Sequence, residues 1–199
     1  MALPAPKQEE KLYTYGDYLT WPDEERWELI EGVPYSMSPA PSRKHQQISV
    51  ELTRQIANFL SNSEGECEVY SAPFDVRLLE ADEDDNEIKT VVQPDIVVIC
   101  DPDKLNDRGC KGAPDFIVEI ISPSTTAKDQ INKVALYEKH GVQEYWIIHP
   151  TDKLLSVRLL SEDGKYSALE IFEGKGARDI KALPGLIINL DAVFGVEKE

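Results

Sequence analysis

The chain has 199 residues, of which 41% are hydrophobic and 29% are charged, and its formal net charge is −16 at pH 7. A chain of this length commonly forms one domain, and its acidic excess argues against a protein that coats nucleic acids, because duplex binding relies on lysine and arginine to neutralise phosphates. No apolar run approaches the roughly 20 residues that span a bilayer and the first residues lack the pattern of a signal peptide, so we expect a soluble, cytoplasmic protein with no membrane partner.

The three cysteines, Cys67, Cys100 and Cys110, show no C-x-x-C spacing. An odd number of cysteines without a secretory signal predicts reduced thiols rather than a disulfide framework. For the same reason we do not expect a zinc site.

The N-terminal part predicts a tail, a short helix and a hairpin. Residues 1–11 predict a flexible tail, and residues 12–195 a single domain. "TYGDYLTWP" predicts a short helix that is capped by Thr14 and ends before Pro22. "RWELIEGVPYSM" alternates as a hairpin does, with Gly32 in its turn.

The stretch "HQQISVELTRQIANFLSNSEG" predicts an amphipathic helix that ends before Gly65. Its apolar residues recur at helical spacing, namely Ile48, Leu52, Ile56, Phe59 and Leu60.

Three strand-like runs follow, "CEVYSAPFDVRLL", "KTVVQPDIVVIC" and "DFIVEIIS". The acidic run Glu80–Glu87 separates the first two and predicts a solvated hairpin loop, and "DPDKLNDRGCKGAP" separates the last two. A helix from about Thr126 to His140 then leads through Gly141 into the buried strand "QEYWIIHP". A helix between two strands predicts a crossover that joins parallel neighbours.

The C-terminal part predicts one more hairpin, "KLLSVRLLSEDGKYSALEIF", with its turn near Asp163 and Gly164. "PGLIINLDAVF" then predicts a strand and a helical turn. The order of elements predicts an α/β fold, a mixed β-sheet flanked by helices with an extra C-terminal β-hairpin.

Two carboxylates fall at the ends of predicted strands. Asp95 opens the strand in "QPDIVVIC", and Glu119 lies near the end of "DFIVEIIS". A carboxylate in an apolar run predicts a cation, a metal or a cleft beside it, because burying an unpaired charge is costly. If the two strands are antiparallel neighbours, the carboxylates meet at one edge of the sheet. Hard oxygen ligands of this kind suit Mg²⁺ or Mn²⁺, which can activate water against a phosphodiester.

Asp129, Lys133 and Tyr137 recur at i, i+4 and i+8 on the following predicted helix and therefore share one face. A lysine that faces the two carboxylates can orient an attacking water or stabilise charge that develops on a phosphate. Taken singly, these residues also fit a solvated helix face.

Three further residues can complete a metal site. His45 opens the first long helix, and Glu28 and Glu31 lie on the first hairpin. Each of them alone is also compatible with an ordinary surface position.

Several segments together resemble the Uma-type restriction endonuclease family among the PD-(D/E)XK nucleases. They span roughly residues 13 to 190, and the combination of the fourth segment with the fifth is the most specific. The segments are "RWELIEGVPYSMSPAPSRKHQQI", "APFDVRL", "VVQPDIVVI", "DFIVEIISPST", "KDQINKVALYEKHGVQEYWIIHP" and "PGLIINL".

The resemblance implies a restriction endonuclease-like fold in which Asp95 matches the acid of the Pro-Asp motif and Glu119 matches the second acid. The lysine of the motif, two residues after the second acid, is replaced here by Ile121. Families of this type are thought to supply the lysine from the next helix, where Lys133 is the matching candidate and Lys128 a weaker one.

The resemblance also implies supporting roles around the two acids. His45 occupies the place where some related nucleases add a metal ligand from the first long helix. Glu31 or Glu28 has the corresponding acidic role, and the motif does not decide between them. Tyr137 is expected to support the stripe that carries Lys133.

The order of these residues and the resemblance together predict a metal-dependent phosphodiester hydrolase, specifically a DNA endonuclease. Asp95, Glu119 and His45 would hold Mg²⁺ or Mn²⁺, Glu31 would help His45 to close the metal shell, and Lys133 would assist the water or the transition state. Related nucleases often cut two strands as dimers, so a homodimer is expected on the resemblance alone.

Two alternatives stay open at this stage. The acidic charge and the displaced lysine favour a nuclease-fold binding or assembly module without catalysis, and an acid–base enzyme with a small phosphorylated substrate needs no long basic track. A basic groove leading to the two acids would favour the nuclease, and a uniformly acidic surround would favour the module.

Overall fold

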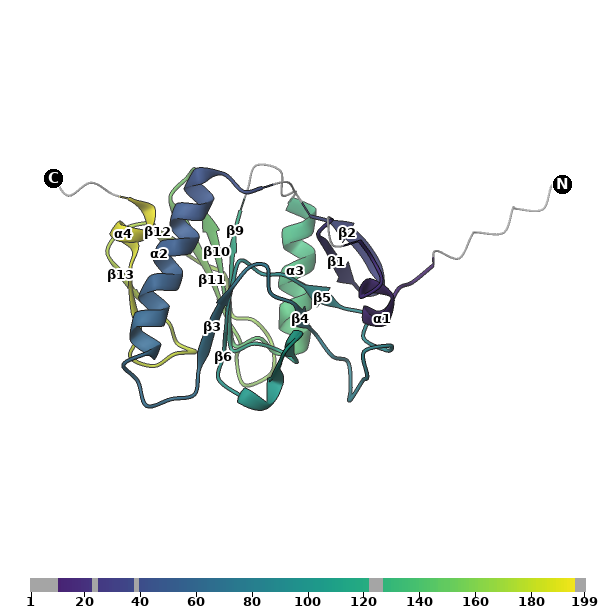
Figure 1. Cartoon of the computed structure of the whole chain (residues 1–199). Coiled ribbons are helices and arrows are strands. Elements are labelled where there is room, and N and C mark those ends of the chain that lie inside the picture. Colours follow the sequence, from purple (N-terminus) through teal and green to yellow (C-terminus); the bar gives the residue numbers. More distant parts are fainter. Residues whose placement is uncertain (1–10, 23–24, 38–39, 122–126, 196–199) are drawn as a thin grey trace.

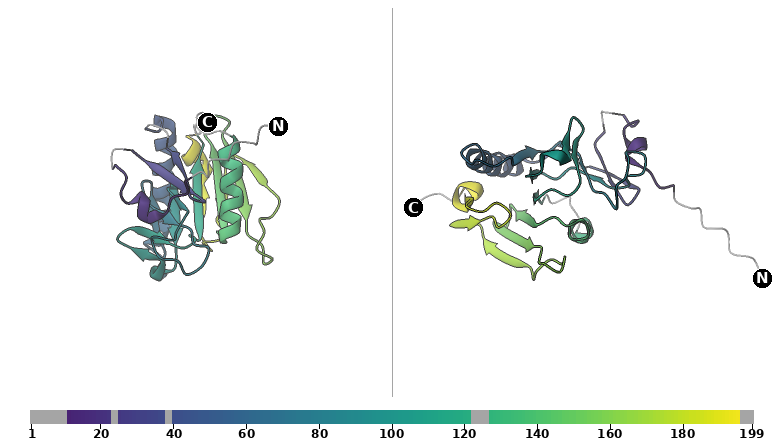
Figure 2. Two further views of the ribbon diagram at one scale, coloured as in Figure 1. Left: turned by 90° about the vertical axis from the view of Figure 1, so that its right-hand side faces the viewer. Right: turned by 90° about the horizontal axis from the view of Figure 1, so that it is seen from below.

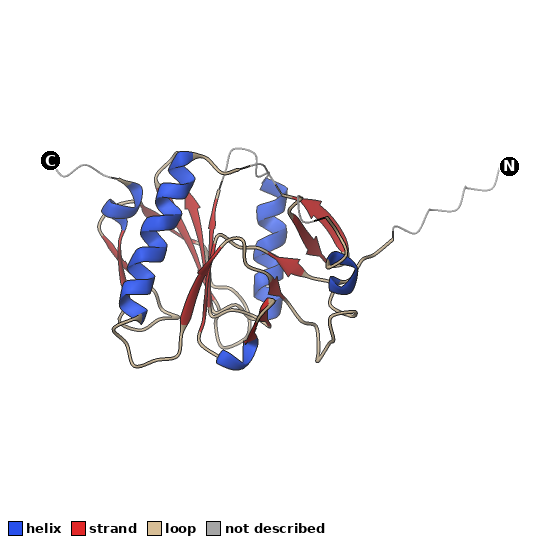
Figure 3. Cartoon of the chain, in the orientation of Figure 1, coloured by secondary structure: helices blue, strands red, loops and turns tan. Residues whose placement is uncertain are grey.

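The chain folds into two six-stranded sheets and a two-stranded sheet, with helices packed against them (Figures 1 and 3). The structure, a computed structural model, describes residues 11–22, 25–37, 40–121 and 127–195, with only the backbone of residues 127–131. The predicted tail at residues 1–11 lies outside the described residues except for Lys11. Within the described part, no helix combines the length and the apolar character that a membrane crossing requires.

The main sheet has the strand order β12-β11-β10-β9-β6-β3. Its strands are β3 (Glu68–Ser71), β6 (Ile96–Ile99), β9 (Phe116–Ile120), β10 (Glu144–His149), β11 (Leu154–Leu159) and β12 (Glu170–Glu173). The neighbours β9 and β10 are parallel and are joined by helix α3 (Ala127–His140), whereas the other neighbouring pairs are antiparallel. This confirms the predicted mixed sheet and crossover, and β11 and β12 form the predicted C-terminal hairpin at its edge.

The second sheet has the strand order β2-β1-β5-β4-β8-β7. Its strands are β1 (Trp27–Ile30), β2 (Val33–Ser36), β4 (Val76–Arg77), β5 (Val91–Val92), β7 (Leu105–Asn106) and β8 (Gly109–Lys111). Helix α1 (Tyr15–Tyr18) begins at the predicted cap Thr14 and packs on this sheet through Tyr15. The short hairpin of β7 and β8, which follows a 3₁₀ turn (Pro102–Lys104), lies where the sequence predicted only a connecting segment.

Two long strands predicted from the sequence are broken in the structure. The first is divided into β3 and β4 around Pro73, and the second into β5 and β6 around Pro94. Because proline has no N–H to donate to a sheet, each run leaves one sheet at the proline and enters the other. The two sheets therefore meet at the residues that flank Pro73 and Pro94.

Helices cover both faces of the main sheet (Figure 2). Helix α2 (Arg43–Leu60), the predicted amphipathic helix, packs Ile48, Leu52 and Ile56 on one face, together with helix α4 (Leu190–Phe194) and the small sheet of β13 (Ala177–Asp179) and β14 (Ile187–Asn189). Helix α3 packs on the other face through Leu136 and Tyr137. Spacing of i, i+4 and i+8 explains why α2 buries one stripe.

Strand alternation assigns the residues of β9 to these two faces. Phe116, Val118 and Ile120 lie on the α2 face, and Ile117 lies on the α3 face. Because the side-chain period of a strand is two, Glu119 also lies on the α3 face.

The expectation of reduced thiols was wrong for two of the cysteines. Cys67 and Cys100 form a disulfide, and Cys110 is free and buried. Cys67 immediately precedes β3 and Cys100 immediately follows β6, and the antiparallel ladder of these strands ends with Glu68 opposite Ile99. The two cysteines are thus brought together by non-local pairing, which spacing along the chain does not reveal.

The acidic run Glu80–Glu87 connects the antiparallel strands β4 and β5, as predicted for a hairpin loop. One of its acids has a structural role, because Asp85 accepts hydrogen bonds from the buried Arg77 and from Arg108. Part of the acidic excess therefore neutralises a buried guanidinium.

Candidate active site

The antiparallel pairing of β6 and β9 brings Asp95 and Glu119 to one end of the main sheet. Ile96 lies opposite Val118, so the residue before β6 faces the end of β9. Oδ2 of Asp95 accepts a hydrogen bond of 2.7 Å from the backbone N–H of Ile120. This contact fixes the Asp95 carboxylate beside the strand that carries Glu119.

Lys133 of α3 faces Glu119, as the helical stripe predicted. Its Nζ lies 2.8 Å from Oε1 of Glu119 and 2.8 Å from Oε1 of Glu28. The hydroxyl of Tyr137, one turn further along, donates a 2.9 Å hydrogen bond to the same oxygen of Glu119. The side chains of Lys128 and Asp129, which the sequence also singled out, lie outside the described residues.

His45 reaches the same end of the sheet from the first turn of α2. Ser42 caps this helix by accepting a hydrogen bond from the His45 N–H. Nε2 of His45 lies 3.2 Å from Oδ2 of Asp95, whereas its buried Nδ1 has no partner among the described residues. His45 is therefore held against Asp95 from the opposite face of the sheet to Lys133.

Glu31, the hairpin acid that was expected to help close the metal shell, lies outside the group, and the structure brings the alternative acid Glu28 to it instead. Glu31 and Gly32 form the two-residue turn between β1 and β2, both with positive φ, 50° and 82°. Such a turn residue points away from the strand face, and Glu31 instead lies 3.4 Å from Lys139 on the surface. Glu28 is buried within β1 and also accepts a 3.0 Å hydrogen bond from the backbone N–H of Gln93.

The ionisation of the group follows from burial and neighbouring charge. Burial is the main cause that raises the pKa of Glu119 above its usual value; the Lys133 ammonium opposes this rise, and Asp95 adds to it. Burial would lower the pKa of Lys133, but the charges of Glu119 and Glu28 outweigh it and raise that pKa. Lys133 therefore stays protonated and cannot act as a base near neutral pH.

The other two supporting side chains also have raised pKa values. Burial is the main cause that raises the pKa of the Tyr137 phenol, so this hydroxyl remains a donor to Glu119. For His45, burial lowers the pKa, but the hydrogen bond and charge of Asp95 outweigh burial and raise it. A protonated His45 would balance the Asp95 charge.

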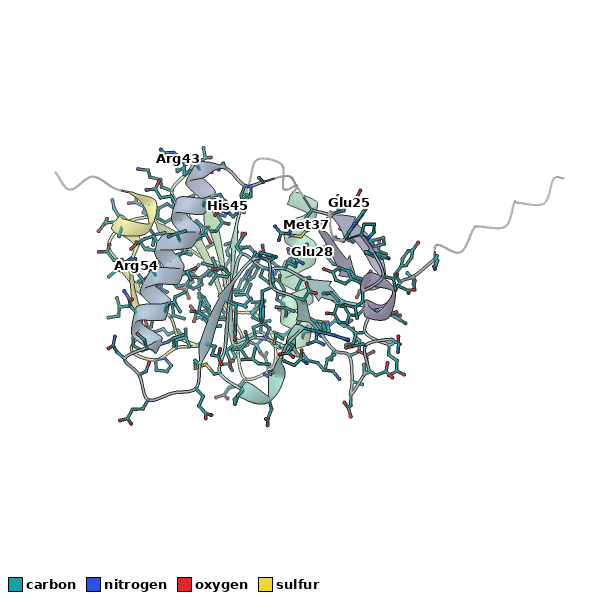
Figure 4. The ribbon with its side chains drawn as sticks, in the orientation of Figure 1. Glu25, Glu28, Met37, Arg43, His45 and Arg54 are labelled. Carbon is teal, nitrogen blue, oxygen red and sulfur yellow. A yellow bond between two sulfur atoms is a disulfide. The ribbon has the colours of Figure 1, made fainter. Side chains whose placement is uncertain are left out.

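A cleft of about 900 Å³ opens above this group. Its walls come from α2 and from the β1–β2 hairpin; Figure 4 shows His45 on the first wall and Glu28 and Met37 on the second. Among the described residues that line it, the acids are Glu28, Asp95 and Glu119, while Arg26, Arg54 and Lys133 contribute basic groups. The cleft is thus free of the acidic excess that dominates the rest of the chain.

Sequence reasoning missed two polar residues of this cleft, Gln93 and Arg26. The side-chain oxygen of Gln93 accepts hydrogen bonds of 3.1 and 2.7 Å from Nε and Nη2 of Arg26. Its amide nitrogen donates to Asp75 and to the hydroxyl of Tyr18. The sequence contained a signal for both residues. Arg26 lies two residues before Glu28 and therefore shares its strand face, and Gln93 directly precedes the Pro-Asp dipeptide.

The carboxylates fit a weakly enclosed divalent ion better than a dedicated protein cage. In the described part of the chain, no three side chains of His, Cys, Asp or Glu are grouped closely enough to hold a metal. Mg²⁺ commonly uses only one or two carboxylates and completes its shell with water and substrate phosphate. The described bonds of the two acids use Oδ2 of Asp95 and Oε1 of Glu119, which leaves Oδ1 of Asp95 and Oε2 of Glu119 without a partner among the described residues.

Comparisons with known proteins identify a relative, a similar solved structure and the family of the chain. The chain is 26% identical over 181 residues to the uncharacterised protein slr1290 of Synechocystis sp. (strain ATCC 27184 / PCC 6803 / Kazusa), with 89% of each chain covered. It also shares its fold with a crystal structure from Anabaena variabilis ATCC 29413, described as "a putative nuclease belonging to DUF820". That likeness has a TM-score of 0.72 at 20% identity and covers 92% of this chain and 97% of the other. A family model described as "Uma2: Putative restriction endonuclease" matches residues 15–191, and the chain therefore belongs to the Uma2 family.

Proposed function

We propose that this protein is a metal-dependent phosphodiester hydrolase that cleaves DNA. The observation that carries the proposal is the position of Asp95 and Glu119 on adjacent strand ends beside the protonated Lys133. Membership of the Uma2 family supports the same reading.

In this proposal, Asp95 and Glu119 hold Mg²⁺ or Mn²⁺. When bound there, the ion would supply Lewis-acid polarisation of the phosphate and a more acidic water. His45 fixes the Asp95 carboxylate, and Tyr137 fixes that of Glu119. Lys133 contributes a positive charge near the place where negative charge develops on the phosphate.

The test is cleavage of plasmid and linear DNA with Mg²⁺ or Mn²⁺, with EDTA as the metal-free control. Asp95→Asn and Glu119→Gln should each reduce cleavage by at least about 100-fold, the scale on which loss of one electrostatic stabiliser acts. Cleavage that persists in both variants would rule out this assignment of the site.

Asp115→Asn is the matched control. Asp115 lies at the opposite end of β9 and, like Asp95, accepts a backbone hydrogen bond, in this case 2.8 Å from Cys100. Its replacement imposes a similar structural cost far from the cleft, so cleavage should be retained.

A catalytically silent module is the second candidate, and one contact favours it. Lys133 already lies 2.8 Å from both Glu28 and Glu119, so each of these two buried carboxylates has a cationic partner without any metal. Calorimetric titration with Mn²⁺ separates the two. Binding that disappears in Glu119→Gln supports the hydrolase, and no binding at millimolar metal supports the module.

Localisation and assembly are also proposals. We expect the protein to act in the cytoplasm and, if it cuts both strands of DNA, to do so as a homodimer. Size-exclusion chromatography with light scattering tests the dimer directly.

A further inference from the structure

The hairpin wall of the cleft presents a cation and an aromatic ring on one face. Glu28 on β1 lies opposite Tyr35 on β2, and Met37 donates its backbone N–H to the carbonyl of Arg26. Because side chains on a strand alternate, Arg26, Glu28, Tyr35 and Met37 lie on one face of the hairpin. All four line the cleft.

Tyr35 is an exposed aromatic residue within the cleft. Its relative exposure is 39%, and it is the aromatic among the exposed large hydrophobic residues of the described chain. Another of these, Val50, is 64% exposed and lines the cleft from α2. The two walls thus each offer an apolar surface beside the polar group formed by Asp95 and Glu119.

Arg26 is a cation without a carboxylate partner among the described residues. Its described hydrogen bonds go to the neutral side chain of Gln93. In contrast, Arg54 is bound by both oxygens of Glu51, and Lys133 lies between two carboxylates. Arg26 is therefore the guanidinium best placed to bind a phosphate entering this cleft.

A stripe of uncharged polar side chains on the α2 wall also faces the cleft. Ser42, Gln46, Ser49 and Thr53 recur at spacings of three and four residues, and all four line the cleft. Hydroxyl and amide groups of this kind commonly contact phosphate and sugar oxygens of nucleic acids without reading sequence.

We infer that the cleft binds a single, unpaired polynucleotide strand, with a phosphate on Arg26 and a base stacked on Tyr35. The inference rests on the proposed function and adds its substrate class. A strand whose bases are unpaired exposes their faces for stacking, whereas a duplex hides them and needs several unpaired cations. The described cleft offers one such cation and an exposed aromatic ring, in a chain with net charge −16.

The test measures binding rather than cleavage, by fluorescence anisotropy with a labelled oligothymidylate and with a hairpin duplex of equal length. Both are titrated in the presence of Ca²⁺, and gels confirm that the probes remain intact. We expect the single strand to bind more tightly than the duplex. Tyr35→Ala should weaken single-strand binding by at least about fivefold, the lower end of base stacking on an aromatic side chain, and Tyr35→Phe should retain it.

Arg26→Gln should weaken binding and lower the slope of log K against log salt by about 0.7, as expected for one phosphate contact on a single strand. Arg108→Gln is the matched control, because Arg108 is an exposed arginine bound to Asp85 away from the cleft. Thermal melts verify that each variant is folded.

The outcomes separate the inference from the proposed function. Equal or tighter duplex binding, or a Tyr35→Ala variant that binds like wild type, overturns the inference even if DNA is cleaved. Selective binding of the single strand without metal-dependent cleavage of any probe supports the inference and overturns the hydrolase.

Discussion

The carboxylate of Glu119 shows how one charged group is tolerated within an apolar strand. Its side chain is 17% exposed, and its Oε1 accepts hydrogen bonds from the ammonium of Lys133 and the hydroxyl of Tyr137. A buried carboxylate with two such donors avoids most of the cost of an unpaired charge. Side chains of the following helix therefore stabilise the acid within the apolar strand "DFIVEIIS".

Replacing Tyr137 by Phe should lower the free energy of unfolding by about 1–2 kcal/mol. The substitution removes one hydrogen bond to a charged group while Lys133 still pairs with Glu119. Urea unfolding should show a lower midpoint with an unchanged slope. Tyr70→Phe is the control, because the Tyr70 hydroxyl bonds to Glu68 on the surface and its loss should cost less than about 0.5 kcal/mol.

The pKa of Glu119 predicts a pH dependence of stability. Because folding raises this pKa above the unfolded value of about 4.3, Glu119 contributes stability that is fully present below about pH 4.3 and is lost as pH rises through the folded-state pKa. The stability of wild type relative to Glu119→Gln should therefore fall with rising pH. Urea unfolding at a series of pH values measures this difference, and a difference that is constant or rises with pH contradicts the prediction.

Glu138→Gln provides a control of opposite sign. The backbone N–H of Tyr166, followed by Lys165, lowers the pKa of Glu138. That group contributes stability above its unfolded pKa, and the contribution is lost as pH falls. Wild type relative to Glu138→Gln should thus gain stability as pH rises through the acidic range.

At the scale of elements, helix α2 holds the cleft wall against the main sheet through one buried stripe. Leu52 is fully buried at the centre of that stripe, whereas Val50 points away from the core. Leu52→Ala should cost about 2–5 kcal/mol of unfolding free energy through lost burial and a cavity. Val50→Ala should change it by less than about 0.5 kcal/mol, and equal losses in chemical denaturation would contradict the packing described.

Elements with local signals were predicted well from the sequence. The cap at Thr14, the turn at Gly32 and the period of α2 are set by neighbours in the chain, and the structure confirms all three. The break at Pro73 was missed because apolar Ala72 and Phe74 flank it, and the break at Pro94 was missed because apolar runs lie just beyond the polar Gln93 and Asp95 on its two sides. Which sheet a short apolar run enters depends on distant strands rather than on its own pattern.

At the scale of the whole molecule, the same distinction applies to the candidate site. Asp95, Glu119, Lys133 and Tyr137 could be predicted together because strand order and helical spacing relate them. The choice of Glu28 over Glu31 depended on which residue occupies the hairpin turn, and the disulfide of Cys67 depended on strand register. The net charge of the chain did not predict the charge of the cleft, because the described residues that line the cleft lack the acidic excess of the chain as a whole.

The breaks at the two prolines have a mechanical consequence for the cleft. Glu28 and Arg26 belong to the part of the chain built around the second sheet, whereas Asp95 and Glu119 belong to the main sheet. The span across the cleft is therefore set by the distance between the two sheets. Lys133 links the sheets, because it pairs with Glu28 of the second sheet and with Glu119 of the main sheet. Packing changes in the shared core, for instance between Val92 and Val97, would alter this span without touching any residue of the site.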